Sequence, residues 1–89
     1  MIVKFRQKFE QDLESINNKK VLSAIARAIE SVENCTKLSE LSNIKKLKAS
    51  KGYFRIRIGN YRIGIFLDKD CVEFVRVLSR DKIYKYFPD

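Results

Sequence analysis

The chain has 89 residues, with 19 basic and 11 acidic side chains for a net charge of +8, and 45% of its residues are hydrophobic. This length suits one domain over residues 1–89, and the two cysteines are too few for the disulfide framework of a small secreted protein. No apolar run is long enough to cross a membrane, and the N-terminus lacks the apolar segment of a signal peptide, so we expect a cytoplasmic protein with no membrane partner.

The positive charge is concentrated in the second half of the chain. Residues 1–44 hold seven basic and six acidic side chains, whereas residues 45–89 hold twelve basic and five acidic ones. Between Lys45 and Arg62 there are seven basic residues and no acidic one. A positive field on one side of a protein attracts polyanions such as nucleic acids. The alternative interpretations are a surface that is merely solvated and a binding surface for an acidic protein.

The first half of the chain predicts a short strand and two helices. Residues 1–5 predict the strand, and apolar residues at helical spacing predict one helix to about Ile16 and another over about residues 19–34. Asn18 stands where its side chain can cap the second helix. Because the loop between the helices is so short, we expect them to form an antiparallel hairpin. The solvated face of the first helix is expected to carry Glu10, Asp12 and Glu14.

The second half predicts an antiparallel sheet. Residues 36–51 indicate a polar connector, after which the hydrophobic period changes to two. Three strands are expected, over residues 53–58, 61–67 and about 71–78. The turns between them fall at Gly59-Asn60 and at residues 68–70. The order β-α-α-β-β-β predicts an α+β fold, in which the helical hairpin packs on one face of the sheet and leaves the other face open.

The open face is expected to carry a group of arginines. Five of them lie within 26 residues, namely Arg55, Arg57, Arg62, Arg76 and Arg80. Arg55 and Arg57 are two residues apart and therefore leave the same face of their strand. Arginine binds phosphate through planar, paired hydrogen bonds and keeps its charge at physiological pH. We interpret Arg76 as an ordinary surface residue or one paired with Glu73, Asp81 or a partner protein. The other four are interpreted as a phosphate-binding group.

Other residues near the arginines also invite an interpretation. Gly64 shares a face with Arg62, and its missing side chain would let a nucleotide approach, with a twist or bulge in the strand as the alternative. Tyr84 can stack on a base or move a proton. Tyr86 and Phe87 are interpreted as packing of the tail against the core.

Several kinds of site lack the residues they need. The chain has no histidine, and its two cysteines, Cys35 and Cys71, are far apart in sequence. It also has no glycine-rich phosphate loop. The commonest zinc ligand and the commonest acid–base group are therefore missing, and we expect neither a metal nor a cofactor.

Two stretches, RIRIGNYRIGI over residues 55–65 and RVLSRDKIYKYFP over residues 76–88, resemble the RelE/ParE toxin superfamily. The resemblance extends over nearly the whole chain and implies a RelE-like toxin of a toxin–antitoxin pair. Such toxins cut messenger RNA in the ribosomal A site, by attack of a 2′-hydroxyl on the adjacent phosphate without a metal. The implied partners are the ribosome, messenger RNA and a cognate antitoxin, in an assembly compatible with a homodimer or a toxin–antitoxin heterotetramer.

The resemblance also implies roles for individual residues. Arg62 would hold the scissile phosphate, Arg80 would stabilise charge on the phosphate or the leaving oxygen, and Tyr84 would stack on a base or assist proton transfer. The complete catalytic set implied is Arg55, Arg57, Arg62, Arg80 and Tyr84. Five lysines are expected to bind RNA, namely Lys46, Lys48, Lys51, Lys82 and Lys85.

The chain also departs from the family pattern. Well-studied relatives carry lysines at the positions of Arg55 and Arg57, many carry a histidine at the position of Ser79, and a long C-terminal helix is missing. The general base stays unassigned, with three candidates, Lys48, Lys51 and Tyr84. Two other functions remain open, a ParE-like toxin that inhibits DNA gyrase and a catalytically weak homologue that binds an antitoxin.

Overall fold

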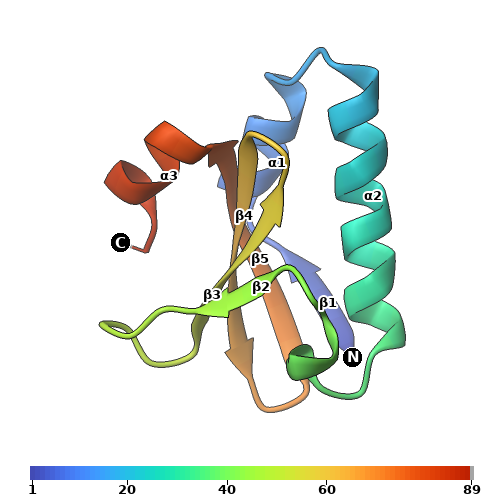
Figure 1. Ribbon diagram of the computed structural model, residues 1–89, viewed down its shortest axis with the longest axis vertical. Helices are drawn as coiled ribbons and strands as arrows, with labels where there is room; N and C mark the ends of the chain where they lie inside the picture. Colours follow the sequence, from blue (N-terminus) through green and yellow to red (C-terminus); the bar gives the residue numbers. More distant parts are fainter. Residues whose placement is uncertain (89) are drawn as a thin grey trace.

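A five-stranded sheet forms the centre of the computed structural model, which describes residues 1–88 and so leaves out Asp89, the last residue of the predicted domain (Figure 1). The strands are β1 (Ile2–Phe5), β2 (Ile44–Lys46), β3 (Tyr53–Ile58), β4 (Tyr61–Asp68) and β5 (Cys71–Ser79). They lie in the order β1-β5-β4-β3-β2, with β1 parallel to β5 and the other pairs antiparallel. The helices are α1 (Gln7–Glu14), α2 (Lys19–Asn34), the short 3-10 turn η1 (Leu38–Glu40) and α3 (Arg80–Tyr86). The α+β fold class is therefore confirmed.

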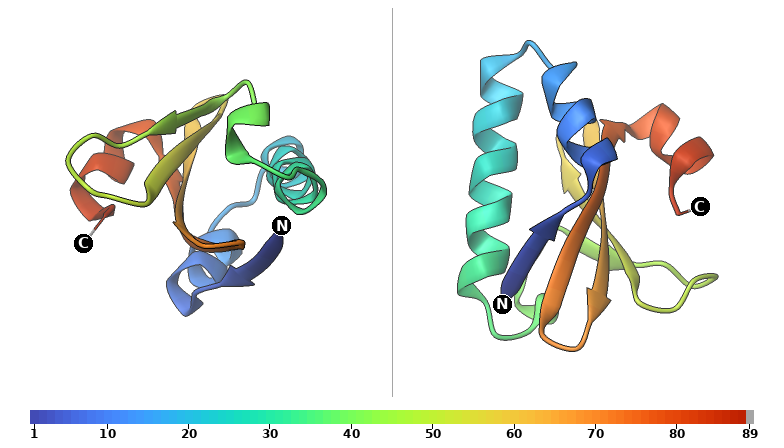
Figure 2. Two further views of the ribbon diagram at one scale, coloured as in Figure 1. Left: turned by 90° about the horizontal axis from the view of Figure 1, so that it is seen from below. Right: turned by 180° about the vertical axis from the view of Figure 1, so that it is seen from behind.

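The main core lies between the sheet and the first two helices. Figure 2 shows α2 along one side of the sheet and α3 on the other. Alternate residues of the strands point toward α1 and α2, and the fully buried side chains of this core are Phe9, Ile25, Val32, Ile56, Ile63, Ile65, Val72, Phe74 and Val77. Burial of a large aliphatic or aromatic side chain contributes about 1.5–3 kcal/mol, so this layer fixes the sheet on which the opposite face is built.

Asn18 caps α2 as the sequence predicts. Its side-chain oxygen accepts hydrogen bonds from the backbone N–H groups of Lys20 and Val21, at 2.9 and 3.2 Å. We expect Asn18→Ala to lower the free energy of unfolding by about 1 kcal/mol, because two N–H groups lose their acceptor. Urea denaturation measures this, with the neighbouring exposed Asn17→Ala as the control. Equal effects of the two replacements would argue against the cap.

Three elements were not expected from the sequence. The predicted connector over residues 36–51 contains η1 and the edge strand β2, which pairs antiparallel with β3. The polar start of the tail forms the seven-residue helix α3. The elements η1 and β2 have three residues each, too few to show a period, and α3 buries a single residue, Ile83. None of the three therefore has a strong hydrophobic pattern.

Part of the face expected to be open is covered by α3. Ile83 and Phe87 pack there against Val75 in a second, smaller core. A Cβ built on Gly64 would lie 2.5 Å from Cδ1 of Phe87, so the space above Gly64 is filled by the chain's own ring. The interpretation that Gly64 leaves room for a nucleotide is therefore wrong. The register between β4 and β5 does shift between Gly64 and Ile65, but the extra residue lies on β5, opposite the strand that carries Gly64.

The two residues of the tail behave differently. Phe87 is buried, as the tail-packing interpretation predicts, but Tyr86 is 49% exposed and that interpretation is wrong for it. The Tyr86 ring lies beside Arg76 instead, with the guanidinium carbon 5.6 Å from the ring centroid.

Arg76 is ion-paired as interpreted, but its partner is Asp12 and not one of the two acidic residues suggested from the sequence. Its Nε and Nη2 atoms donate to the two carboxylate oxygens of Asp12, at 2.8 and 3.0 Å. The Asp12 side chain is only 10% exposed and also accepts the backbone N–H of Val77. The prediction that Asp12 lies on a solvated face is therefore wrong, whereas Glu10 and Glu14 are exposed as expected.

Candidate functional site

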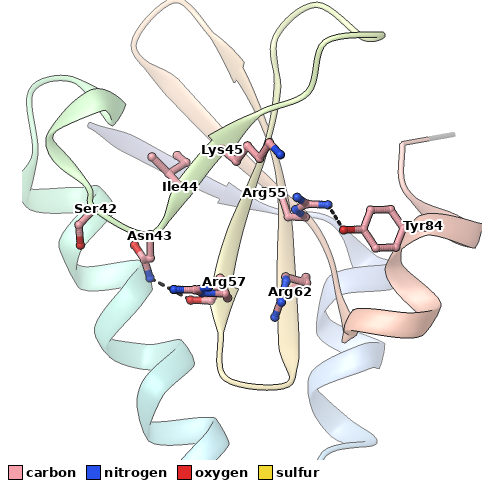
Figure 3. A pocket seen from close by; sticks show the side chains of 8 residues that line it. All are labelled: Ser42, Asn43, Ile44, Lys45, Arg55, Arg57, Arg62 and Tyr84. Carbon is pink, nitrogen blue, oxygen red and sulfur yellow. Dashed lines mark hydrogen bonds between the residues drawn. The ribbon is translucent and has the colours of Figure 1, made fainter.

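A pocket of about 380 Å³ opens on the face of the sheet opposite α2 (Figure 3). Three strands and α3 contribute side chains to it. We call it the arginine pocket, and its lining consists of Ser42, Asn43, Ile44, Lys45, Arg55, Arg57, Arg62 and Tyr84. Four of the five predicted catalytic residues are thus brought together in one place.

Strand pairing explains why the positive charges meet. Arg57 lies directly opposite Arg62 across the β3–β4 hairpin, and Arg55 lies opposite Lys45 of β2. The two-residue turn fixes the first pairing, with Gly59 at a φ of 53° that favours glycine. Like charges directly opposite each other destabilise a sheet. The arrangement therefore costs folding energy, which an anion bound in the pocket would offset.

Arg62 is held in place by the hairpin turn. Its Nη1 donates hydrogen bonds to the carbonyl oxygens of Gly59 and Tyr61, at 2.7 and 2.9 Å. Burial lowers the pKa of Arg62, and the positive charges of neighbouring arginines, Arg55 first, lower it further, while Tyr84 acts in the opposite direction. The group still keeps its proton at neutral pH. It is thus a fixed cation in a strongly positive field, which suits phosphate binding.

Tyr84 reaches the pocket from α3. Its hydroxyl accepts a hydrogen bond from Nη1 of Arg55 (Figure 3). The guanidinium carbon of Arg55 also lies 4.9 Å from the centroid of the Tyr84 ring. The ring is 66% exposed, so it is both oriented by an arginine and accessible to a base that would stack on it.

Arg80, the fifth predicted catalytic residue, stands beside the pocket and is not part of its lining. As the first residue of α3, it donates its backbone N–H to the carbonyl oxygen of Asn60, at 2.8 Å. Its charge is close enough to contribute to the lowered pKa of Arg62. Arg80 is therefore placed at the rim, next to the hairpin turn.

The five lysines predicted to bind RNA lie outside the arginine pocket. Lys46, Lys48 and Lys51 surround Leu47 in a separate pocket of about 600 Å³, which we call the lysine pocket. Lys82 lines a smaller pocket of about 250 Å³ beside Asp12 and Ser79, and Lys85 is exposed on α3. They extend the basic surface without joining the arginine cluster.

Sequence reasoning missed Lys45 as a lining residue. Lys45 is the first of the basic residues between positions 45 and 62, but its position opposite Arg55 follows only from the pairing of β2 with β3. Asn43 was missed for the same reason; its side-chain nitrogen donates to the carbonyl oxygen of Arg57, at 3.0 Å. Recognition of the short strand would have found both.

The arginines of the site have no carboxylate partner within residues 1–88. Ion pairs in this part of the chain join Arg6 to Glu73 and Arg76 to Asp12. The same residues hold no group of three or more side chains able to ligate a metal, and no helix long and apolar enough to cross a membrane. The guanidinium groups of the arginine pocket therefore remain available to an external anion.

Comparisons with known proteins identify relatives along nearly the whole chain. A family model described as the ParE toxin of the type II toxin–antitoxin system parDE matches residues 3–84. Toxin RelE3 of Methanocaldococcus jannaschii is 43% identical over 89 residues, which span 99% of this chain and 100% of that protein.

Solved structures show similarity to the same group of toxins. A chain of the RelB-RelE antitoxin–toxin complex from Methanococcus jannaschii superimposes with a TM-score of 0.81 at 40% identity, over 96% of this chain and 99% of that one. YafQ from E. coli superimposes with a TM-score of 0.74 over 92% of this chain and 96% of its own, and at 14% identity it shows the shared fold alone.

Proposed function

The chain belongs to the RelE/ParE toxin superfamily as a RelE-like toxin, an endoribonuclease, and we propose that it cleaves ribosome-bound messenger RNA in the arginine pocket. The observation that carries this proposal is the convergence of Arg55, Arg57 and Arg62 from two neighbouring strands. No carboxylate within residues 1–88 neutralises them. A pocket of this kind binds the phosphate of a polynucleotide.

The chemistry follows from the charges. The 2′-oxygen of a ribose forms a bond to the adjacent phosphorus while the bond from phosphorus to the 5′-oxygen breaks. The products are a 2′,3′-cyclic phosphate and a 5′-hydroxyl. Negative charge grows on the phosphoryl oxygens as the new bond forms, and fixed cations at those oxygens stabilise the transition state. Arg62 is the best placed of them, because the hairpin turn already holds it.

Two protons must also move, one from the 2′-hydroxyl and one to the 5′-oxygen. Arginine scarcely gives up its proton, whereas lysine and tyrosine titrate at lower pH. Lys45 and Tyr84 are the lining residues of these two types, and they supply the general base and acid. Lys48 and Lys51, two general-base candidates from the sequence, lie in the lysine pocket instead.

The partners and location follow from the same proposal. The RelB-RelE structure contains a relative together with its antitoxin, so a cognate antitoxin binds this toxin as well. The assembly is a toxin–antitoxin heterotetramer, or a homodimer when the toxin is alone. The net charge of +8 favours an acidic antitoxin segment over the arginine pocket. Because the substrate is ribosome-bound messenger RNA, the toxin acts in the cytoplasm.

A ParE-like inhibitor of DNA gyrase is the second candidate, because the matching family model is a ParE toxin. Gyrase inhibition requires a protein–protein interface and no phosphate pocket. The arginine pocket and the 43% identity to Toxin RelE3 favour the nuclease.

Purified protein incubated with ribosomes programmed with a defined messenger RNA separates the candidates. We expect cleavage of the bound message, with 2′,3′-cyclic phosphate and 5′-hydroxyl ends mapped by primer extension and end-specific ligation. Free messenger RNA is the control and is expected to stay intact. An intact message on the ribosome, together with a DNA-damage response on expression in cells, would replace the nuclease with the gyrase inhibitor. An intact message without that response would support the remaining candidate, a catalytically weak homologue that only binds an antitoxin.

A further inference from the structure

We propose that Arg76 and Tyr86 are positioning residues, which set the rotation of α3 and thereby place Tyr84 in the arginine pocket. The inference rests on the proposed function for its catalytic consequence. Neither residue lines the pocket, and each acts through the helix that carries Tyr84 and Arg80.

A helix of seven residues is unstable by itself, so contacts with the sheet decide how α3 lies. Ile83 and Phe87 are four residues apart and form one apolar stripe, which anchors α3 on β4 and β5. A single stripe fixes the distance of a helix from a sheet but leaves it able to roll. Side chains on both flanks of the stripe are needed to fix the rotation.

Tyr84 and Tyr86 occupy those two flanks. Successive residues of a helix are about 100° apart, so positions 84 and 86 lie on nearly opposite sides of α3. Tyr84 contacts Arg55 of β3, and Tyr86 contacts Arg76 of β5. The helix is thus held between two arginine–tyrosine contacts, one inside the arginine pocket and one outside it.

The arginine of the outer contact is held more firmly than the arginine of the inner one. Asp12 binds Arg76 through two hydrogen bonds, which fix the plane of the guanidinium, and the two side chains are only 10% and 14% exposed. Arg55 in the arginine pocket has no such carboxylate partner within residues 1–88. Arg76 is therefore held in place by Asp12, and its contact with Tyr86 fixes the rotation of α3. That rotation in turn places Tyr84 in the arginine pocket.

Single-turnover cleavage on programmed ribosomes tests the proposal with Tyr86→Ala and Tyr86→Phe. Loss of the arginine–ring contact is expected to lower the rate at saturating toxin about three- to fivefold in Tyr86→Ala, with unchanged half-saturation. Tyr86→Phe keeps the ring and is expected to keep the rate. In a Tyr84→Ala background, Tyr86→Ala is expected to have no further effect, because the residue it places is gone and Arg80 is held at the start of α3 by its own backbone hydrogen bond to Asn60.

The proposal is overturned if Tyr86→Phe is as slow as Tyr86→Ala, if half-saturation changes in place of the rate, or if the two alanine effects multiply. A readout without catalysis keeps the test independent of the nuclease assignment. The ring signals of Tyr84 in an NMR spectrum are expected to move toward those of a freely rotating tyrosine in Tyr86→Ala and to stay in place in Tyr86→Phe. Unchanged Tyr84 signals in both variants would refute the positioning role even if the wild-type protein cleaves no RNA.

Discussion

Arg62→Ala is expected to lower the rate of messenger RNA cleavage on the ribosome by a factor of about 10²–10³, the usual effect of removing one fixed group that stabilises transition-state charge. Nη1 of Arg62 is already held by the carbonyl oxygens of Gly59 and Tyr61. The position of the cation is therefore set before substrate binds, and no reorganisation is needed as charge develops on the phosphate. The cleavage rate is measured by quantifying the new messenger RNA ends over time on programmed ribosomes.

Arg62→Lys and Arg27→Ala are the controls for this prediction. Lysine keeps the charge but loses the planar pair of donors, so we expect an intermediate rate. Arg27 is exposed on α2, which covers the other face of the sheet, and its replacement removes the same charge without touching the arginine pocket. The proposed site is wrong if folded Arg62→Ala cleaves as fast as Arg27→Ala.

The stability of Arg62→Ala gives a second, independent check. Arg62 lies opposite Arg57, and burial together with the surrounding arginines lowers its pKa, so its charge is disfavoured in the folded protein. Removal of that disfavoured charge compensates for the two lost hydrogen bonds to the turn. We therefore expect an unfolding temperature close to that of the wild type, measured by circular dichroism, so that lost cleavage reflects chemistry.

The sequence predicted those parts of the site that depend on local geometry. Arg55 and Arg57 share a face because strand side chains alternate, and the two-residue turn after β3 brings Arg62 opposite Arg57. Both inferences need only a few neighbouring residues. To place Lys45 in the site, one must know that the three-residue strand β2 pairs with β3, and the sequence has no periodic signal for that pairing.

The face of β5 on which Arg76 lies depends on one extra residue in that strand. Strict alternation would put Phe74 and Arg76 on the same face of β5. The register instead pairs Ile65 with Phe74 and Gly64 with Arg76, so Val75 is the extra residue of a bulge. Phe74 therefore points into the main core while Arg76 reaches Asp12 of α1. A bulge is set by packing on both sides of the sheet, which alternation along one strand cannot reveal.

The role of Gly64 also depends on contacts from a distant part of the chain, and it leads to the second large effect. Gly64→Ala is expected to lower the free energy of unfolding by about 2 kcal/mol, as overpacking of a filled core does. The new Cβ would lie 2.5–2.6 Å from three carbons of the Phe87 ring, so the ring must move. Because Phe87 and Ile83 anchor α3, we also expect cleavage to fall at least tenfold as Tyr84 and Arg80 lose their places.

A double-mutant cycle with Phe87→Ala separates this clash from any other effect of the added methyl group. Phe87→Ala alone removes a buried ring and is expected to cost about 3 kcal/mol. In the double variant the Cβ of residue 64 enters space that the ring has left, so its cost is expected to equal that of Phe87→Ala alone. Urea denaturation of the four proteins measures the coupling. Additive losses would mean that the added methyl group does not act through the Phe87 ring, and that Phe87 does not hold α3 against the sheet through this contact.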